Sequence, residues 1–145
     1  MTLDPWHIFT ANFGQVPKPY TAFATLLDMV LYFFLSFTVS QGRRIYKIRS
    51  PLAETEGPEK FQRFYRMQMS LLEQLVFHLP TLWVAAYAMD DVFAALIGLI
   101  WLFGRLLYAV RYYQKPNRRI KGYIISMIAN IILLIGAMAG TIASF

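Results

Sequence analysis

The strongest constraint on the fold is a set of four apolar stretches, each long enough to cross a lipid bilayer. They cover about residues 20–41, 66–89, 92–113 and 120–144. A helix needs roughly 20 residues to span a hydrocarbon core of about 30 Å, so each stretch predicts one transmembrane helix. Hydrophobic residues make up 57% of the chain and charged residues 15%, which excludes an ordinary water-soluble globule and a disordered chain. We expect an all-α membrane protein of one domain, residues 1–145, with four transmembrane helices in an antiparallel bundle.

The basic residues set the expected orientation of these helices. Of the 14 Lys and Arg residues, twelve lie in or beside the connections that follow the first and third stretches. The first connection carries Arg43, Arg44, Lys47, Arg49, Lys60, Arg63 and Arg66, and the second carries Arg111, Lys115, Arg118, Arg119 and Lys121. Because basic loops stay in the cytoplasm, both connections are expected there and both termini on the other side. The expected location is a bacterial inner membrane, with the endoplasmic reticulum membrane as the alternative.

The residue types exclude several kinds of site and partner. The chain has no cysteine, which rules out disulfides, thiolate metal sites and a cysteine nucleophile. Its two histidines, His7 and His78, lack the spacing of a metal site, so no metal is expected. No nucleic-acid partner is expected either, because the basic groups lie at the bilayer. Beside the tyrosines of the second connection they are typical of contacts with lipid headgroups, or of a site for a polyanionic ligand.

Ionisable residues inside apolar stretches are costly, so each one is a candidate site. Two helical faces carry such groups: Arg66, Ser70, Glu73 and Phe77 on the second stretch, and Arg105, Tyr108 and Tyr112 on the third. Two interpretations are open from the spacing. In one, Glu73 and Arg105 form a structural ion pair; in the other, Glu73 holds the ammonium group of a ligand and Arg66 its carboxylate. Spacing alone favours the structural pair by roughly two to one.

Asp28 lies well inside the first apolar stretch. It is either a proton-coupling carboxylate or an acid bonded to a neighbouring helix, for example to Asn130 on the fourth stretch, and the structural interpretation is favoured. His78 in the second stretch is expected to be hydrogen-bonded rather than bound to a metal. Pro80, two residues later, is expected to kink its helix.

Three segments together resemble a known family. They are FQRFYRMQMSLLEQ (61–74), TLWVA (81–85) and AALIGLIWLFGRLLYAVRYY (94–113), preceded by the pattern RR-x(6)-PL that begins at Arg43. This order resembles the MAPEG superfamily, the membrane-associated proteins in eicosanoid and glutathione metabolism. The resemblance is closest to its microsomal glutathione transferase and leukotriene-synthase branch, and it covers roughly residues 43–145.

The resemblance implies a homotrimer of four-helix subunits that binds glutathione between neighbouring subunits at the cytoplasmic side. It also implies roles for individual residues. Arg66 and Gln68 resemble the contacts to the carboxylate and backbone of glutathione, Glu73 the contact to its ammonium group, Tyr108 and Tyr112 the tyrosines of the third span, Arg119 the arginine that stabilises the glutathione thiolate, and Arg43 and Arg44 the paired arginines after the first span. With this resemblance, the ligand interpretation of Arg66 and Glu73 takes precedence over the structural one.

Two positions depart from the family pattern. Ser70 stands where the family usually has asparagine, four residues after the arginine that Arg66 matches. Gln74 stands where the leukotriene-type branch has a tyrosine beside the glutamate. Serine keeps a hydrogen-bonding group with a shorter reach, so these departures leave the affinity and the identity of the ligand open.

The expected function is that of a membrane-bound glutathione transferase or peroxidase, with glutathione as cosubstrate. Glutathione has two carboxylates, an ammonium group and a thiol, so its site needs cations, an acid and a positive charge near sulfur, which favours the nucleophilic thiolate. The second substrate would be a lipophilic electrophile that arrives from the bilayer. Two alternatives are a non-catalytic lipid-binding or scaffold member of the same fold and a small proton-coupled exporter that uses Asp28 or Glu73.

Overall fold

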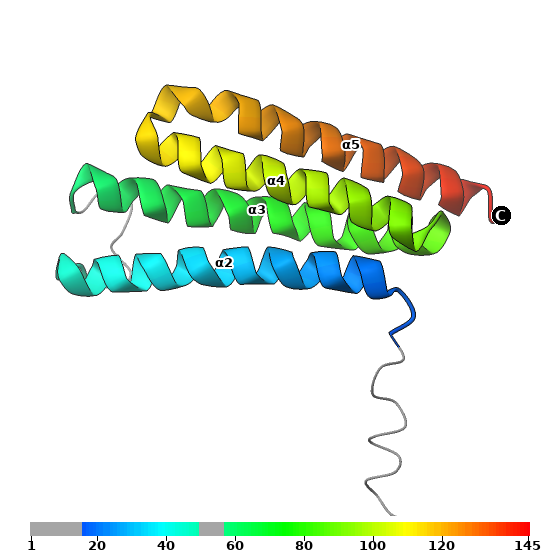
Figure 1. Ribbon diagram of the computed structural model, residues 1–145, viewed down its shortest axis with the longest axis horizontal. Helices are drawn as coiled ribbons and strands as arrows, with labels where there is room; N and C mark the ends of the chain where they lie inside the picture. Colours follow the sequence, from blue (N-terminus) through cyan, green and yellow to red (C-terminus); the bar gives the residue numbers. More distant parts are fainter. Residues whose placement is uncertain (1–15, 50–56) are drawn as a thin grey trace, which may run out of the picture.

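The computed structural model describes residues 16–49 and 57–145, which form four long helices and one short one. The long helices are α2 (Pro19–Ile45), α3 (Glu59–Ala88), α4 (Asp91–Gln114) and α5 (Ile120–Ile142), and the 3-10 helix η1 (Pro116–Arg119) joins α4 to α5. Consecutive long helices run antiparallel in one elongated bundle (Figure 1). The described residues contain no strand, which confirms the all-α prediction for them. The Pro51–Leu52 pair of the family pattern lies outside the described residues.

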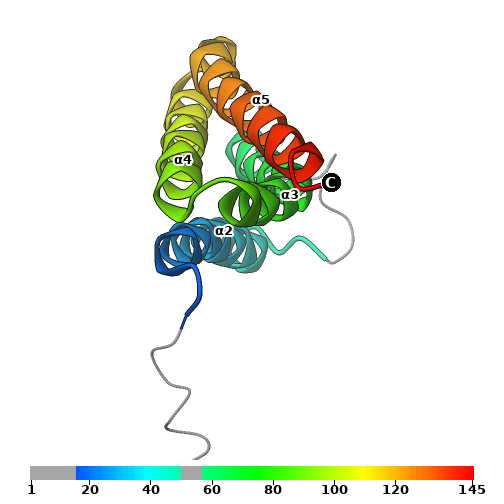
Figure 2. The ribbon, with the colours of Figure 1, turned by 90° about the vertical axis from the view of Figure 1, so that its right-hand side faces the viewer.

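Two helices form the centre of the bundle. Helices α3 and α4 contact each other, and each of them also contacts α2 and α5. Within the described residues α2 and α5 do not contact each other, and they lie on opposite sides of the central pair (Figures 1 and 2). Leu71, Trp101 and Leu133, from α3, α4 and α5, are enclosed almost completely between these helices. The interior is therefore packed by apolar side chains from neighbouring helices.

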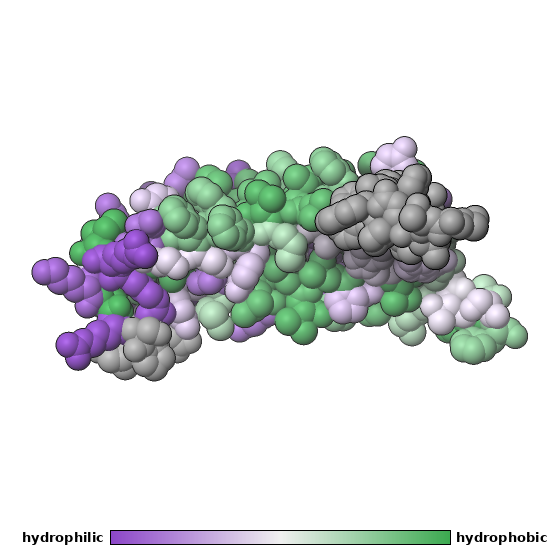
Figure 3. All heavy atoms as spheres, turned by 90° about the horizontal axis from the view of Figure 1, so that it is seen from below, coloured by the Kyte–Doolittle hydropathy of each residue, from purple (hydrophilic) through white to green (hydrophobic). Residues whose placement is uncertain are grey.

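Large apolar side chains also cover the outside of the bundle. Phe33 on α2, Val76 on α3 and Ile135 on α5 each expose more than half of their surface. Figure 3 shows apolar residues over the middle of the molecule and hydrophilic residues gathered at one end. That end holds the twelve basic residues of the two connections, because α2 and α4 end there and α3 and α5 begin there. An apolar outer surface of this extent is not tolerated in water, which supports a membrane protein.

Three segments of the described chain are long and apolar enough to cross a membrane: Pro19–Ile45, Asp91–Gln114 and Pro116–Ile142. Helix α3 does not meet this standard, although it has 30 residues. Its first turns carry Glu59, Arg63 and Arg66, and Glu73 follows in the middle. These charges lower its mean hydropathy. The second predicted span, residues 66–89, and with it the predicted total of four spans are therefore not confirmed by composition.

Helices α4 and α5 approach each other closely at two glycines. A Cβ atom at Gly122 would lie 2.7 Å from the carbonyl oxygen of Gly104, and one at Gly104 would lie 2.8 Å from the backbone nitrogen of Ser126. Both distances are well below van der Waals contact. The Ser126 hydroxyl adds a hydrogen bond of 3.0 Å to the carbonyl oxygen of Gly122. Glycine at these positions lets the two backbones meet, as small residues do in membrane helix pairs.

A chain of buried polar side chains crosses the bundle interior. Asp28 Oδ2 lies 3.5 Å from His78 Nε2, and His78 Nδ1 lies 2.8 Å from Asn130 Oδ1. The prediction that Asp28 contacts a neighbouring helix is therefore correct, but its neighbour is His78, which stands between it and Asn130. The prediction that His78 is hydrogen-bonded is confirmed, and its ring also stacks on Trp101 at a centroid distance of 3.8 Å.

The bundle predicts a labelling pattern that reports orientation. Because the chain has no cysteine, the variants Ser144→Cys, after α5, and Lys115→Cys, between α4 and η1, each carry one reactive thiol at opposite ends of the bundle. In intact cells a membrane-impermeant maleimide should label Ser144→Cys, and it should label Lys115→Cys only after the membrane is permeabilised. The reverse pattern would show that the basic end lies outside the cell.

Candidate functional site

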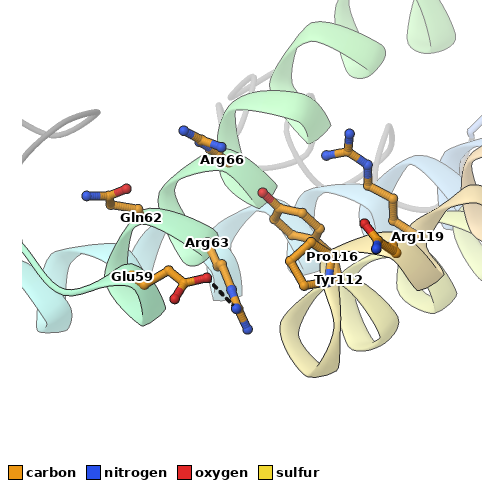
Figure 4. A pocket seen from close by; sticks show the side chains of 8 residues that line it. Glu59, Gln62, Arg63, Arg66, Tyr112, Pro116 and Arg119 are labelled. Atoms are coloured by element: carbon orange, nitrogen blue, oxygen red, sulfur yellow. Dashed lines mark hydrogen bonds and ion pairs between the residues drawn. The ribbon is translucent and has the colours of Figure 1, made fainter.

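Two cavities open at the basic end of the bundle, and Arg119 lines both. The first, here named the η1 cavity, has a volume of about 250 Å³ and is lined by Glu59, Gln62, Arg63, Arg66, Tyr112, Pro116, Asn117 and Arg119 (Figure 4). The second, named the Ser70 cavity, has a volume of about 410 Å³ and is lined by Ser70, Tyr108, Arg119, Ile120 and Tyr123. Together they bring residues of α3, α4, η1 and α5 to one place.

The η1 cavity is strongly cationic. Arg66 extends from α3 and Arg119 from η1, with the Tyr112 ring between them (Figure 4), and the Arg119 guanidinium carbon lies 5.4 Å from the centre of that ring. Among the described residues, no acid lies within ion-pair distance of either guanidinium. Arg63 is instead engaged, since it pairs with Glu59 and donates a hydrogen bond of 3.1 Å to the carbonyl oxygen of Tyr113. Two guanidinium groups are thus available to an anion.

The Ser70 cavity borders a buried cation, Arg105. Only 2% of the surface of Arg105 is exposed, and its Nη2 donates a hydrogen bond of 3.1 Å to Ser70 Oγ. Its guanidinium carbon lies 4.6 Å from the centre of the Tyr108 ring, which stacks in turn on Tyr112 at 5.7 Å. Within the described chain, Nε and Nη1 of Arg105 have no hydrogen-bond partner. The aromatic pair and the serine therefore hold this cation at the inner wall of the site.

The structural ion pair that spacing favoured between Glu73 and Arg105 is not formed in this chain. No ion pair between them lies within 4.0 Å, and Glu73 is exposed on the surface of α3. The reason is the rotation of α3, which turns Ser70 toward Arg105 and leaves Glu73, three residues later, on the outer face. Arg105 therefore takes a hydroxyl group rather than a carboxylate as its partner.

The nine predicted site residues fall into two groups. Five of them line the two cavities: Arg66, Ser70, Tyr108, Tyr112 and Arg119. The other four do not line them: Arg43, Arg44, Gln68 and Glu73. Of the second group, Arg43, Arg44 and Gln68 lie on the side of the bundle where α2 and α3 meet.

The contacts of that second group show why it lies apart. Gln68 Nε2 donates a hydrogen bond of 2.9 Å to Ser36 Oγ on α2. The Arg43 guanidinium carbon lies 6.0 Å from the centre of the Phe61 ring and 5.9 Å from that of the Tyr65 ring. Arg44, the next residue, is exposed near the end of α2. One copy of the chain therefore does not gather all nine residues around a single cavity.

Gln62, Glu59 and Tyr123 also line the cavities without having been predicted as site residues from the sequence. Gln62 and Glu59 lie one and two helical turns before Arg66 and line the η1 cavity with it. The same spacing of about 3.6 residues per turn that linked Arg66 to Ser70 could have identified them. Tyr123, in the first turn of α5, lines the Ser70 cavity, and no sequence signal distinguished it from an interfacial tyrosine.

Comparisons with known proteins agree on one family. The model of the MAPEG family matches residues 21–139. The chain is 40% identical to an uncharacterized protein of Synechocystis over 81% of this chain and 84% of the relative. It is 37% identical to leukotriene C4 synthase of Cavia porcellus over 86% of this chain and 81% of that protein. It is also 32% identical to microsomal glutathione S-transferase 2 of Homo sapiens, over 81% of this chain and 79% of that protein.

The contact between Arg105 and Ser70 predicts an unusually large effect of a small substitution. Ser70→Ala removes the hydroxyl that accepts from the buried guanidinium, so the free energy of unfolding should fall by about 1–3 kcal/mol. The matched control is Ser40→Ala on α2, because Ser40 is exposed and its hydroxyl bonds only its own helix. Thermal unfolding in detergent measures both variants. Equal free energies of unfolding for the two variants would show that the hydrogen bond between Arg105 and Ser70 does not stabilise the fold.

Proposed function

The chain belongs to the MAPEG family, and on this premise we propose that it is a membrane-bound glutathione transferase. It activates the thiol of glutathione at the cytoplasmic boundary of the membrane and directs it at lipophilic electrophiles or lipid hydroperoxides. Two of the relatives are named leukotriene C4 synthase and microsomal glutathione S-transferase 2. These names support glutathione as the cosubstrate.

The observation that carries the proposal is a pair of guanidinium groups at the η1 cavity that form no ion pair with any acid of the described residues. Arg66 and Arg119 flank the buried Tyr112 at the basic end of the bundle. At this end a water-soluble anion would meet a molecule dissolved in the membrane. A guanidinium group matches a carboxylate with two parallel hydrogen bonds. We assign a glutathione carboxylate to Arg66 and the sulfur to Arg119.

The proposed chemistry needs no group beyond the cosubstrate and the cation. A fixed positive charge beside the sulfur favours thiolate over thiol. The thiolate attacks an electrophilic carbon, a bond between sulfur and carbon forms, and the electron pair of the broken bond leaves with a halide or an epoxide oxygen. With a hydroperoxide, sulfur takes one oxygen, the alcohol leaves, and a second glutathione reduces the sulfenic acid to disulfide and water. Binding both reactants at one boundary supplies proximity.

We also propose that the site is completed by a second copy of the chain in a homotrimer. Glu73 carries a carboxylate on an outer face of α3 that also exposes Leu72, Val76 and Phe77. A carboxylate facing lipid in such surroundings is costly, which favours cover by a neighbouring subunit. That neighbour would contribute Arg43, Arg44 and Gln68 from its α2–α3 side, and Glu73 would then bind the glutathione ammonium group.

The membrane arrangement proposed with this function has four spans. Helix α3 lies lengthwise against α2, α4 and α5, which supports a path through the same thickness of membrane although its composition is more polar. Its charged first turns would lie at the boundary with the other basic groups. The basic end faces the cytoplasm and the termini face the other side, in a bacterial inner membrane.

The role of Arg119 predicts a specific loss on substitution. Arg119→Ala should leave glutathione binding nearly intact, raise the pKa of the bound thiol, and reduce turnover. The expected loss of transition-state stabilisation is about 2.7–4 kcal/mol, the scale for a deleted preorganised donor. Thiolate absorbance in the ultraviolet, titrated against pH, and turnover of an aryl halide measure the two effects.

Arg118→Ala is the matched control, because Arg118 precedes Arg119 in η1 and lines neither cavity. It should change thiolate formation little. If Arg119→Ala retained thiolate formation and turnover at the level of the unmodified protein, Arg119 would bind lipid headgroups instead. Arg44 would then be the next candidate for the thiolate.

The role of Glu73 predicts a change in affinity without a change in fold. Glu73→Gln should weaken glutathione binding by about 1.5–3 kcal/mol, the range for a charged hydrogen bond. Calorimetric titration measures the affinity, and native mass spectrometry in detergent checks that the trimer persists. Unchanged affinity in an intact trimer would remove Glu73 from the site, and a protein that is chiefly dimeric would contradict the proposed assembly.

A further inference from the structure

The buried polar chain that begins at Asp28 does not end at Asn130. Asn130 Nδ2 donates a hydrogen bond of 3.2 Å to Gln74 Oε1, so the chain runs Asp28, His78, Asn130, Gln74 and links α2, α3 and α5. The first three side chains expose 3% of their surface or less, whereas Gln74 is half-buried. The chain therefore leads from the bundle interior to its surface.

The amide groups in this chain have a defined orientation. Asn130 turns its Oδ1 atom toward His78 Nδ1, at 2.8 Å. An amide oxygen accepts and cannot donate, so Nδ1 is the donor of this hydrogen bond. The Asn130 amide nitrogen therefore faces the other way and donates to Gln74 Oε1.

The consequence is that Gln74 presents its NH₂ group outward. Its Nε2 has one further contact, at 3.8 Å from the sulfur of Met127, and a thioether is a weak acceptor. The group borders a cavity of about 180 Å³ between α3 and α5. The cavity is lined by Gln74, Phe77, Met127, Asn130, Ile131 and Leu134. A strong acceptor on a ligand in this cavity would receive the hydrogen bond that sulfur receives poorly.

The surroundings restrict what such a ligand is. The other side chains around the cavity are apolar apart from Asn130, whose amide is already engaged. Leu134 also borders a second, apolar cavity of about 360 Å³ that extends along α3 and α5 between Pro80 and Ile142, with room for an alkyl chain. Gln74 follows Ser70 by four residues, one helical turn of about 5.4 Å. The donor therefore lies one helical turn along α3 from Ser70, which lines a cavity together with Arg119.

We propose that Gln74 is a specificity-determining hydrogen-bond donor that selects lipophilic electrophiles bearing a carbonyl oxygen, namely enones with an apolar chain. This inference rests on the proposed function and names its substrate class. In the reaction the glutathione sulfur bonds to the β-carbon of the enone, and the electron pair of the carbon–carbon double bond moves toward oxygen. The enolate oxygen accepts the hydrogen bond from Gln74, and water protonates the α-carbon. The proton that the thiol gave to water when the thiolate formed balances the one that water gives to the α-carbon, and no group leaves, so atoms and electrons balance.

The first test measures binding without glutathione, so its result does not depend on catalysis. The probe is 3-nonen-2-one with a ¹³C carbonyl group, added to the protein in lipid nanodiscs and followed by infrared spectroscopy. The bound carbonyl band should shift to lower wavenumber than in empty nanodiscs. Gln74→Met, which keeps the length of the side chain, should abolish the shift, and Gln62→Met, an amide of the η1 cavity, should retain it. An identical band in Gln74→Met and unmodified protein would overturn the proposal.

A double variant tests whether the buried chain orients the donor. Asp28→Leu with His78→Leu replaces the buried pair by apolar groups, a change that bundles tolerate. The Asn130 amide can then rotate, so Gln74 presents its oxygen part of the time and the carbonyl shift should become smaller. A full shift in the double variant, with folding verified by thermal unfolding, would contradict the orienting role of the pair.

The last test separates this inference from the proposed function. With glutathione present, Gln74→Met should lower kcat/KM for 3-nonen-2-one by about 2- to 10-fold, the range for one neutral hydrogen bond. For 1-bromononane, which has no oxygen acceptor, kcat/KM should stay unchanged. Equal losses for both electrophiles would overturn the selective role of Gln74. If the unmodified protein transferred glutathione to neither compound, the proposed function would fail, while the infrared comparison would still decide whether Gln74 binds carbonyl groups.

Discussion

A polar side chain inside a membrane-spanning bundle must find its partner on another helix, because the hydrocarbon around it offers none. Two such partnerships organise this molecule. Arg105 on α4 is held by the Ser70 hydroxyl on α3, and His78 on α3 connects Asp28 on α2 to Asn130 on α5. Each contact forms at only one rotation of the helices about their axes and one shift of the helices along each other. Ser70 and Gln74, which line the cavities of the two proposed ligand sites, lie on neighbouring turns of α3. Ser70 belongs to the first partnership, and Gln74 is hydrogen-bonded to Asn130 of the second.

The positions of the helices follow closely from the sequence. The ends of α4 and the start of α5 agree within a residue with the apolar stretches, because Asp90 and Asp91 at one end and the basic connection at the other mark where apolar character stops. Helix α3 begins at Glu59 rather than near residue 66. Its first two turns are polar, so hydropathy cannot detect them, although charged residues favour helix at a membrane boundary.

The spacing of residues along the sequence does not predict how each helix is rotated about its axis. The shared face of Arg66 and Ser70 was predicted correctly, and both line the basic end of the bundle. Spacing alone favoured an ion pair of Arg105 with Glu73 over a ligand role of Glu73, and Arg105 instead donates a hydrogen bond to the Ser70 hydroxyl. Spacing identifies residues on one helical face, but which neighbouring side chain that face meets depends on packing. The separation of Arg43, Arg44 and Gln68 from the cavities has the same origin, since α2 contacts the opposite side of α3.

The close approach of α4 and α5 has a mechanical consequence. Where Gly104 and Gly122 let the two backbones meet, the side chain nearest to Gly104 is the short one of Ser126. No long side chain lies there that could deform, so these helices behave as one stiff body. Helix α4 carries Tyr108 and Tyr112, and η1, which joins it to α5, carries Arg119. The aromatic and cationic walls of the cavities are thereby fixed relative to each other. Any widening that admits a bulky molecule must come from displacement of α3.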